Sequence, residues 1–343
     1  MKSLKWYFVL PKMQDIPSGG NLYNAQLIGA LRAKNIDLEV MDFEAYLEAR
    51  EQGLRGLFWI DTLFLDQFGA LPPLAEGPMI HGLLVHHLES LYPPKGIESD
   101  DWYAQNEADI LARFEWFLAT SPYTCKYLQF RGFASEQIVV APPALSFQPV
   151  WREGDTEEVR ALMVSNLVER KGVLPFLHGL AERFDRMGPF NLTIVGSDEI
   201  ETDYAAACHE LLDRYPQLQQ KVLLTGSLLP RKTQRYYRYS NLYISTAYME
   251  TYGMSLQEAR SFRLPILTLD GGNAASHVRH GSNGLVFGSI DNLLDEFQLL
   301  SQDPKRFESF HARAQQCCTE DAYDWHEVAN RVLSALPTLS WKK

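Results

Sequence analysis

The chain has 343 residues, of which 46% are hydrophobic and 22% charged, and its formal net charge is −11. These proportions are typical of a soluble globular protein with room for two domains, and they exclude disordered and membrane proteins. The start of the chain up to Pro11 has too few apolar residues for a signal-peptide core, and no run approaches the roughly 18 apolar residues of a membrane span.

The negative charge is concentrated in the first half. Residues 1–155 contain 12 Lys and Arg against 20 Asp and Glu, whereas the remainder contains 20 against 23. This balance argues against nucleic acid as a partner and against strong binding to membranes. The four cysteines form no C-x-x-C pair. We therefore expect a reducing, cytoplasmic compartment.

Short apolar runs alternate with helical patterns along the whole chain, as in parallel α/β units. In the first half we predict helices at 22–33 and 122–130, and strands at 4–10, 38–41, 57–61, 79–86, 116–119 and 138–140. A second series of strands is predicted at 161–164, 192–195, 222–224, 242–244, 266–267 and 285–287. The segment from Asp303 to about Leu336 is predicted to be helical, with Trp325 as an anchor.

A linker is predicted between the two series. The segment 141–149 contains three prolines without periodicity, and the charged stretch 152–158 follows it. We expect doubly wound domains at 1–150 and 151–320, facing each other across a cleft, and a C-terminal helix within 321–343 that packs back on the first domain.

The first candidate site follows the first strand. Gly19 and Gly20 precede the first predicted helix and would allow close backbone approach to a phosphate or sugar, although a tight turn explains them equally well. They lack the G-x-G-x-x-G spacing of a dinucleotide site.

The strand at 79–86 ends in His86, and His87 follows it. A histidine at a strand end can bond sugar hydroxyls or transfer a proton. A buried histidine with a satisfied hydrogen bond is the alternative for each. No cysteine lies nearby, so zinc is not predicted.

The loop after the strand at 161–164 contains Asn166 and Arg170, and Lys171-Gly172 opens the following helix. This arrangement places an ammonium group where a phosphate would bind. The alternative is a solvated loop. Residues 226–229, including Leu228, are expected to pass the base of a nucleotide.

The most informative segment runs from Tyr248 to Arg260, after the strand at 242–244. Glu250 and Glu258 are eight positions apart and bracket a predicted helix start. The backbone N–H groups of the three residues there, Gly253, Met254 and Ser255, would bind a phosphate.

Glu250 can reach whatever that phosphate carries. We expect Glu258 at the helix surface, where its carboxylate would accept hydrogen bonds from a ribose and contribute little to stability. The alternative is that both glutamates only favour the helix start. Downstream, Asp270-Gly271-Gly272 and Asn283-Gly284 predict sharp turns. The first of these turns would pass close to the same phosphate-bearing ligand.

These motifs together resemble retaining family 4 glycosyltransferases of the GT-B fold. Glu250 and Glu258 match the E-x7-E motif of that family, and the segment from Glu250 through Tyr252 to Gly253 resembles its E-x-F/Y-G core. The stretch 164–172 resembles the "V-G-R-L-x-x-x-K-G" loop, and 119–121 resembles an "A-x-S" strand end. Gly19-Gly20 and the later glycine pairs occur in the family's order.

The resemblance implies roles for several residues. Lys171 would neutralise the donor diphosphate, Glu250 would bond hydroxyls of the donor sugar, and Glu258 would hold the ribose. His86, or alternatively His87, would lie on the acceptor side of the sugar, in an acceptor-binding N-terminal domain. The chain departs from the family at Asn166, where an arginine often clamps the diphosphate, and Arg170 could replace it or point to solvent.

The leading hypothesis is a retaining hexosyltransferase that uses a nucleoside diphosphate sugar, UDP-sugar by default, and a carbohydrate or other hydroxyl acceptor. The chain lacks a D-x-D motif, and Asp100-Asp101 has the wrong spacing, so no cofactor or essential metal is expected. The alternatives are a nucleotide-sugar epimerase or hydrolase, and a non-catalytic nucleotide-sugar binder on the same scaffold.

Overall fold

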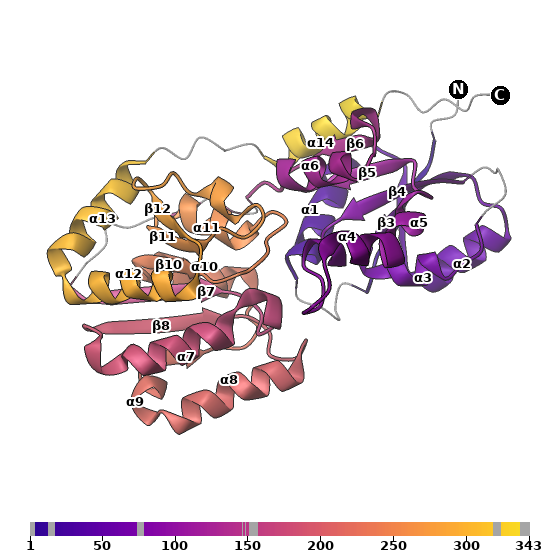
Figure 1. The fold of residues 1–343 in the computed structure, drawn as a ribbon. Helices are drawn as coiled ribbons and strands as arrows, with labels where there is room; N and C mark the ends of the chain where they lie inside the picture. The colour runs from indigo at the N-terminus through magenta and orange to yellow at the C-terminus, as the bar shows by residue number, and fades with distance from the viewer. Residues whose placement is uncertain are drawn as a thin grey trace. The chain divides into compact units, whose positions relative to one another are not determined.

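The computed structural model describes residues 4–12, 18–73, 79–145, 147, 149–150, 157–317 and 324–336. The chain divides into two compact units (Figure 1). Unit 1 combines Met1–Ser146 with Tyr323–Lys343, and unit 2 is Phe147–Ala322. The predicted linker at 141–149 and the charged stretch after it lie partly outside the described residues.

Unit 1 is built on a parallel sheet of six strands in the order β2-β1-β3-β4-β5-β6. Its strands are β1 (Trp6–Val9), β2 (Leu38–Met41), β3 (Gly56–Asp61), β4 (Met79–Val85), β5 (Trp116–Ala119) and β6 (Ile138–Val140). The central strands β1 and β3 are buried along their whole length, as expected for strands covered on both faces.

The main helices of unit 1 are α1 (Gly19–Ala33), α2 (Phe43–Glu51), α3 (Leu65–Gly69), α4 (Ser99–Trp102), α5 (Ala108–Leu111), α6 (Pro122–Phe130) and α14 (Trp325–Ala335). Short helical turns are η1 (Thr62–Phe64), η2 (Glu89–Leu91), the π-helical η3 (Tyr103–Glu107) and η4 (Ser135–Gln137). Side chains cap several helix starts: Ser18 caps α1, and Asp324 forms a capping box with Glu327 on α14.

Helix α14 brings the end of the chain back to unit 1 (Figure 1). It packs against α1 and β6, and its Trp325 is buried and meets the ring of Tyr23 edge to face at 5.4 Å. The hydroxyl of Tyr23 in turn donates to the carbonyl of Ala141 at 2.8 Å. This helix is therefore part of the core of unit 1.

Unit 2 has a second parallel sheet of six strands, in the order β12-β11-β10-β7-β8-β9. Its strands are β7 (Val159–Val164), β8 (Phe190–Val195), β9 (Val222–Leu224), β10 (Leu242–Ser245), β11 (Ile266–Leu269) and β12 (Gly284–Phe287). The order reverses between β7 and β10, and ligands of such sheets bind at the carboxyl ends of the strands beside this switch point.

The helices of unit 2 are α7 (Val173–Arg183), α8 (Thr202–Arg214), α9 (Pro216–Gln219), α10 (Pro230–Tyr239), α11 (Met254–Ser261), α12 (Ile290–Gln302) and α13 (Pro304–Gln316). The short turns are η5 (Glu169–Lys171), η6 (Phe184–Arg186) and η7 (Ala274–His277). One apolar core lies between the sheet and α7, α8 and α12, and a second lies on the α10 and α11 side.

The predicted strands are confirmed in both units, and α6 has the predicted bounds. The predicted start of the first helix is wrong, because α1 begins at Gly19 instead of residue 22. No described helix is both long and apolar enough to cross a lipid bilayer.

Candidate functional site

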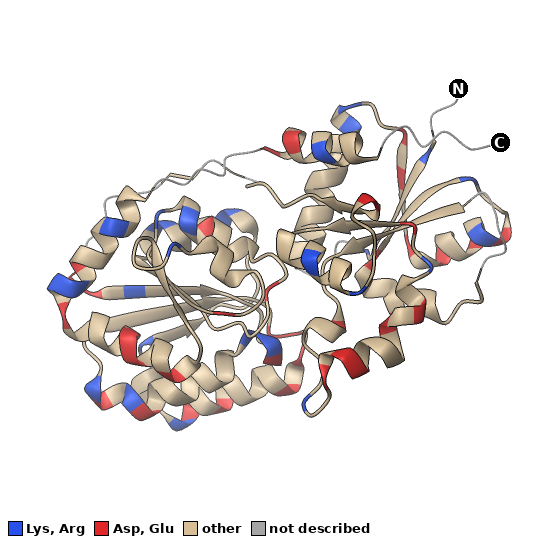
Figure 2. Ribbon diagram, turned by 45° about the horizontal axis from the view of Figure 1, so that its top comes forward, with Lys and Arg blue, Asp and Glu red and all other residues tan. Residues whose placement is uncertain are grey.

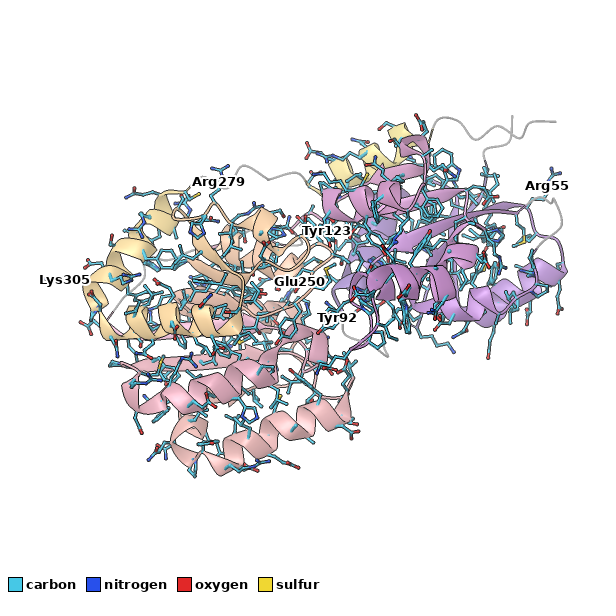
Figure 3. All side chains as sticks on the ribbon, viewed as in Figure 1. Arg55, Tyr92, Tyr123, Glu250, Arg279 and Lys305 are labelled. Carbon is cyan, nitrogen blue, oxygen red and sulfur yellow. The ribbon has the colours of Figure 1, made fainter. Side chains whose placement is uncertain are left out.

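The predicted donor residues of unit 2 gather at the switch point of its sheet. The loop after β7 contains Lys171, and the loop after β10 contains Glu250, which Figure 3 labels. Since β7 and β10 are hydrogen-bonded neighbours, the two loops leave adjacent strand ends at the same edge. A lysine and a glutamate that are 79 positions apart in sequence are thereby brought together.

The ammonium of Lys171 donates to a carboxylate oxygen of Glu250. Both side chains are largely buried, with 16% and 10% of their surfaces exposed. Burial lowers the pKa of Lys171, against the opposing effect of Glu250. Burial alone would raise the pKa of Glu250, but the charges of Lys171 and Arg170 outweigh it and lower the pKa. The site therefore holds a buried ion pair.

Arg170 does not project freely into solvent. It is half-buried, and its guanidinium donates to the carbonyl of Met249 at 2.7 Å. Its charge acts on both Lys171 and Glu250. A second cation therefore stands beside the ion pair.

Asn166 stands where family 4 glycosyltransferases often have an arginine. Its side chain forms a hydrogen bond that joins two loops. Its side-chain oxygen accepts from the backbone N–H of Ser197 at 2.9 Å, and the N–H of Leu167 donates to the carbonyl of Ser197 at 2.8 Å. The asparagine joins the loops that follow β7 and β8.

Three glycines allow the loops after β7 and β11 to pack closely against the backbone of the loop after β10. Gly172 has φ +65°, and a Cβ there would collide with the carbonyl of Thr246. A Cβ on Gly271 would lie 2.6 Å from the carbonyl of Ala247, and one on Gly272 would collide with the carbonyl of Glu250. These close approaches position Glu250, whose carbonyl accepts from the N–H of Asn273 at 2.7 Å.

Helix α11 begins as predicted, directly after Gly253. This residue has φ +90° and ψ 59°, and a Cβ there would lie 3.0 Å from Leu256. Its carbonyl accepts the first two bonds of the helix, from Leu256 and Gln257 at 3.1 Å each. The N–H groups of Gly253 and of the half-buried Met254 and Ser255 precede these bonds and belong to the open end of the helix.

The carbonyl of Tyr252 fixes this turn. It accepts from the amide of Asn273 at 2.8 Å and from Nε2 of His277 at 2.6 Å. Because a carbonyl can only accept, Nε2 of His277 carries the proton. All three residues are buried, and the rings of Tyr252 and His277 meet edge to face at 5.0 Å. Two donors on one carbonyl hold the left-handed turn in place.

The expectation that Glu258 lies at the surface is wrong. The side chain is half-buried, and burial raises the pKa of this carboxyl to about 7, against the opposing effect of a hydrogen bond with Tyr237. Tyr237 is buried on α10, and its hydroxyl donates to the carbonyl of Ser255 at 3.0 Å. Glu258 therefore influences stability as well as any ligand.

Leu228 lies in the loop between β9 and α10. It is half-buried and packs against the apolar core on the α11 side. Gly226, two residues earlier, has φ +67°, and its carbonyl accepts from the N–H of Gly196 at 3.2 Å. This loop therefore lies beside the one that follows β8.

Unit 1 has its own polar cluster. The amide of Asn24 on α1 donates to the carboxylate of Asp61 at the end of β3, at 2.7 Å. This bond orients the amide so that its oxygen accepts from Nε2 of His86 at 2.8 Å. Burial lowers the pKa of His86 against the opposing charge of Asp61, whose oxygen lies 3.5 Å from Nε2. The imidazole is therefore neutral, with Nδ1 as its acceptor.

The two glycines before α1 are not a tight turn. Gly19 and Gly20 are the first two residues of the helix. A Cβ on Gly20 would lie 3.1 Å from the ring of His86, so this glycine allows α1 to approach the histidine.

The predicted geometry of the histidine pair also needs correction. Strand β4 ends at Val85, so strand alternation does not set the directions of His86 and His87. Their backbone N–H groups both donate to the hydroxyl of Thr62, at 3.2 and 3.4 Å. His81, at the start of the same sequence run, is a buried histidine bonded to the hydroxyl of Tyr46 at 3.0 Å.

The sequence prediction missed several residues of these sites: Asn24, Asp61, Tyr237, Asn273 and His277. Asp61 carried a usable signal, because a carboxylate directly after a buried strand lies at the ligand-binding edge. Asn273 follows the singled-out glycine pair directly. Among the described residues, no group of three or more His, Cys, Asp and Glu side chains could hold a metal ion.

Comparison with known proteins agrees with this architecture. Residues 151–316, just under half of the chain, match the family model of glycosyl transferases group 1. No curated protein matches the sequence.

Several solved structures share the fold. The Anabaena protein Alr3699/HepE, solved with UDP and glucose, is 16% identical with a TM-score of 0.74, covering 98% of this chain and all of the other. Sucrose-phosphate synthase from Thermosynechococcus elongatus is 17% identical with a TM-score of 0.72, over 96% and 97% of the two chains. The lipopolysaccharide outer core galactosyltransferase WaaB is 15% identical with a TM-score of 0.61, over 97% and 100%.

At these identities the likeness establishes the fold, and it confirms the predicted two-domain α/β GT-B class. The segment 151–316 is similar to the glycosyl transferases group 1 family.

Proposed function

We propose that the protein is a retaining hexosyltransferase that uses a nucleoside diphosphate sugar, with UDP-sugar as the first candidate, and a carbohydrate or other hydroxyl acceptor. One observation carries the proposal: the buried ion pair of Lys171 and Glu250 stands at the switch point, beside the open N-terminus of α11. An ammonium, a carboxylate and a helix N-terminus there suit the diphosphate and sugar of such a donor.

Each donor group has a candidate partner in unit 2. Lys171 and the N–H groups of residues 253–255 would bind the diphosphate, with Arg170 as the second cation. Glu250 would exchange part of its ion pair for hydroxyls of the sugar, and Glu258 would accept hydrogen bonds from the ribose. Leu228 would pass the base. From unit 1 we also assign Gly19 and Gly20 to the donor, as their glycine pair suggests.

In the proposed reaction, the bond between the anomeric carbon and the phosphate oxygen breaks. The acceptor oxygen bonds to that carbon from the same face, and its proton passes to the departing phosphate. Lys171 and the helix N-terminus would stabilise the charge that grows on the phosphate, and one such donor is worth roughly 3 kcal/mol. This route requires no protein nucleophile, and we propose that it requires no metal.

We assign the neutral imidazole of His86 to the sugar on the acceptor side. The bond from Asn24 fixes the tautomer, in which Nδ1 is the nitrogen that can accept a hydrogen bond. The Anabaena protein that shares the fold was also solved with UDP-glucose, which favours UDP-glucose as the first donor to test.

Asn166 favours a second candidate, a binder of nucleotide sugars without transferase activity. Its side chain is used by the backbone of Ser197 instead of contributing a charge to the site. Arg170, whose charge acts on the ion pair, supports the transferase.

A donor and acceptor assay tests the proposal. Thermal shift with UDP, GDP and ADP should single out one nucleotide, and release of that nucleotide from its sugar should accelerate when sugar acceptors are added. NMR of the product should show the anomeric configuration of the donor. Nucleotide binding without release of sugar would support the second candidate, a nucleotide-sugar binder without transferase activity. A product with inverted anomeric configuration would refute retention.

A further inference from the structure

Helix α10 is the centre of an unusually basic part of unit 2. Residues 214–249 contain six Lys and Arg and no Asp or Glu, in a chain that has 43 acidic residues. Elsewhere both signs of charge are interspersed on both units (Figure 2). Four of the six cations lie on this ten-residue helix. The proposed function above makes no use of them.

The four cations of α10 lie on its outer side. Arg231, Arg235 and Arg238 are spaced i, i+4 and i+7, so they share one face, and Lys232 lies beside them. All four side chains are exposed, whereas Thr233 and Tyr237 are buried towards the sheet. None of the four forms an ion pair with any residue that the structure describes.

Two arginines elsewhere in unit 2 are paired with nearby carboxylates. Arg306 binds Glu296 at 2.8 Å, and Arg183 binds Asp291 at 3.0 Å. The cations of α10 therefore stand out because the sequence around them supplies no carboxylate.

Two exposed apolar side chains lie on the same side of the sheet as these cations. Strand β9 is the edge of the sheet, and its Val222 and Leu224 face the core under α7 and α8. Side chains alternate along a strand, so Leu223 faces the α10 side, and 52% of its surface is exposed. Tyr239, at the end of α10, is 55% exposed. The basic face, defined as Arg231, Lys232, Arg235, Arg238, Leu223 and Tyr239, is thus amphipathic.

We propose that this basic face docks on the anionic lipid headgroups of a membrane surface. Lys and Arg bind anionic headgroups, while leucine and tyrosine side chains enter the boundary between headgroups and acyl chains. Anionic lipids diffuse to a local patch of cations. A nucleic acid instead has a fixed charge density and would bring phosphates against a protein whose net charge is −11.

This inference does not depend on the proposed transferase. The sequence-based expectation of no strong membrane binding rests on the acidic residues 1–155, and α10 lies outside them. The binding expected here is salt-sensitive, because four surface cations are screened at moderate ionic strength.

Vesicle co-flotation tests the proposal, with phosphatidylglycerol mixed into phosphatidylcholine and with phosphatidylcholine alone. The test variant carries Arg231→Gln, Lys232→Gln, Arg235→Gln and Arg238→Gln, because glutamine preserves helix propensity. The control variant has the same net charge and replaces four scattered exposed cations with glutamine: Arg32, Lys126, Arg186 and Lys305. Thermal unfolding of both variants verifies that they fold.

The wild-type chain and the control should float with the phosphatidylglycerol vesicles at low salt and leave them at high salt. The test variant should partition more than about tenfold less. Leu223→Ser with Tyr239→Ser should weaken binding while its salt dependence remains.

Equal loss in test variant and control would overturn the proposal, since net charge alone would then explain binding. So would no binding of the wild type to phosphatidylglycerol, and so would capture by RNA or an acidic polypeptide in preference to the vesicles. If the test variant fails to fold, loss of wild-type binding on addition of salt, together with the Leu223 and Tyr239 variant, decides the question.

Discussion

At the scale of single residues, the ion pair of Lys171 and Glu250 couples binding to stability. Removing one partner of a buried pair leaves the other charge uncompensated, which typically costs 3–5 kcal/mol. The two roles of Lys171 can be separated only by measuring folding, nucleotide affinity and turnover together.

Lys171→Ala should lower kcat on the order of 100-fold, because the ammonium matters most as the diphosphate departs. Binding of the free nucleotide should weaken less. Steady-state kinetics and calorimetry at a temperature where the variant stays folded give the comparison. Arg170→Ala is the matched change, and a larger loss of kcat there would assign the main charge to the arginine.

Glu258 makes stability depend on pH. Its pKa in the folded chain, about 7, lies above the ordinary value of 4.5. Its favourable contribution is therefore present below pH 4.5 and is lost as the pH rises through 7. Glutamine cannot ionise, whereas Glu258 of the wild type ionises between pH 5 and pH 8. Glu258→Gln should therefore raise the melting temperature relative to wild type more at pH 8 than at pH 5.

Thermal melts across pH check this, with the exposed Glu308→Gln on α13 as control. A Glu258→Gln increment independent of pH would contradict the raised pKa. The same variant should lose about 1–3 kcal/mol of nucleotide affinity if the carboxylate binds the ribose.

His86→Ala should slow sugar transfer by about 100-fold while nucleotide affinity is retained, because the neutral imidazole is held by Asn24 in the unit that lacks the ion pair. His87→Ala should matter less. Transfer rates and nucleotide affinities of both variants, measured together, decide the assignment. Equal activities, or a greater loss at His87, would show that the other histidine acts.

At the scale of elements, loops between strands and helices position the candidate site. The start of α11 depends on Gly253 in a left-handed conformation, on the two donors to the carbonyl of Tyr252, and on the packing of His277 against both. Several independent contacts therefore fix the conformation of this turn, as a preorganised anion site requires.

Gly253→Ala should destabilise the protein by about 1–3 kcal/mol, since alanine is strained at φ +90° and its Cβ would lie 3.0 Å from Leu256. Nucleotide affinity should fall with it. Chemical denaturation measures the first effect and calorimetry the second. In Gly29→Ala on α1, where a Cβ meets nothing within 4 Å, stability should rise, and a similar loss at both sites would refute the argument.

The elements themselves were largely predictable. Most strands follow nearly continuous apolar runs, which a buried parallel sheet imposes directly on the sequence. The sequence does not predict the start of α1, because two adjacent glycines favour a loop, although Ser18 is an N-cap signal. Gly20 has no side chain because His86, far along the chain, occupies that space.

The site was predictable in its parts and not in its contacts. The pairing of Lys171 with Glu250 depends on the switch point between β7 and β10, which no local pattern states. Glu258 is hydrogen-bonded to Tyr237, which comes from another helix. Asn24 lies inside a helix without a distinctive sequence motif. Its place in the polar cluster follows only from its hydrogen bonds with Asp61 and His86.

At the scale of the whole molecule, the two units differ in how the chain builds them. Unit 2 is continuous in sequence, whereas unit 1 is completed by α14. Because most of the proposed nucleotide-binding residues lie in unit 2, nucleotide should mainly stabilise unit 2, by about 2.7 kcal/mol at a concentration 100 times its Kd.

Trp325→Ala should destabilise unit 1 by roughly 3–5 kcal/mol, because it empties the contact with Tyr23 and α1. Calorimetry should show that UDP raises one unfolding transition and that the substitution lowers the other. A single transition that both changes shift equally would show that the units unfold together.

The return of α14 to unit 1 has a consequence for synthesis. In topological terms unit 2 is an insertion within unit 1, between Ser146 and Tyr323. A chain emerging from the ribosome therefore completes its second domain first, contrary to the usual N-terminal order. Until the final helix is released, the surface of α1 around Tyr23 stays uncovered, so the nascent first domain is the one that needs protection from aggregation.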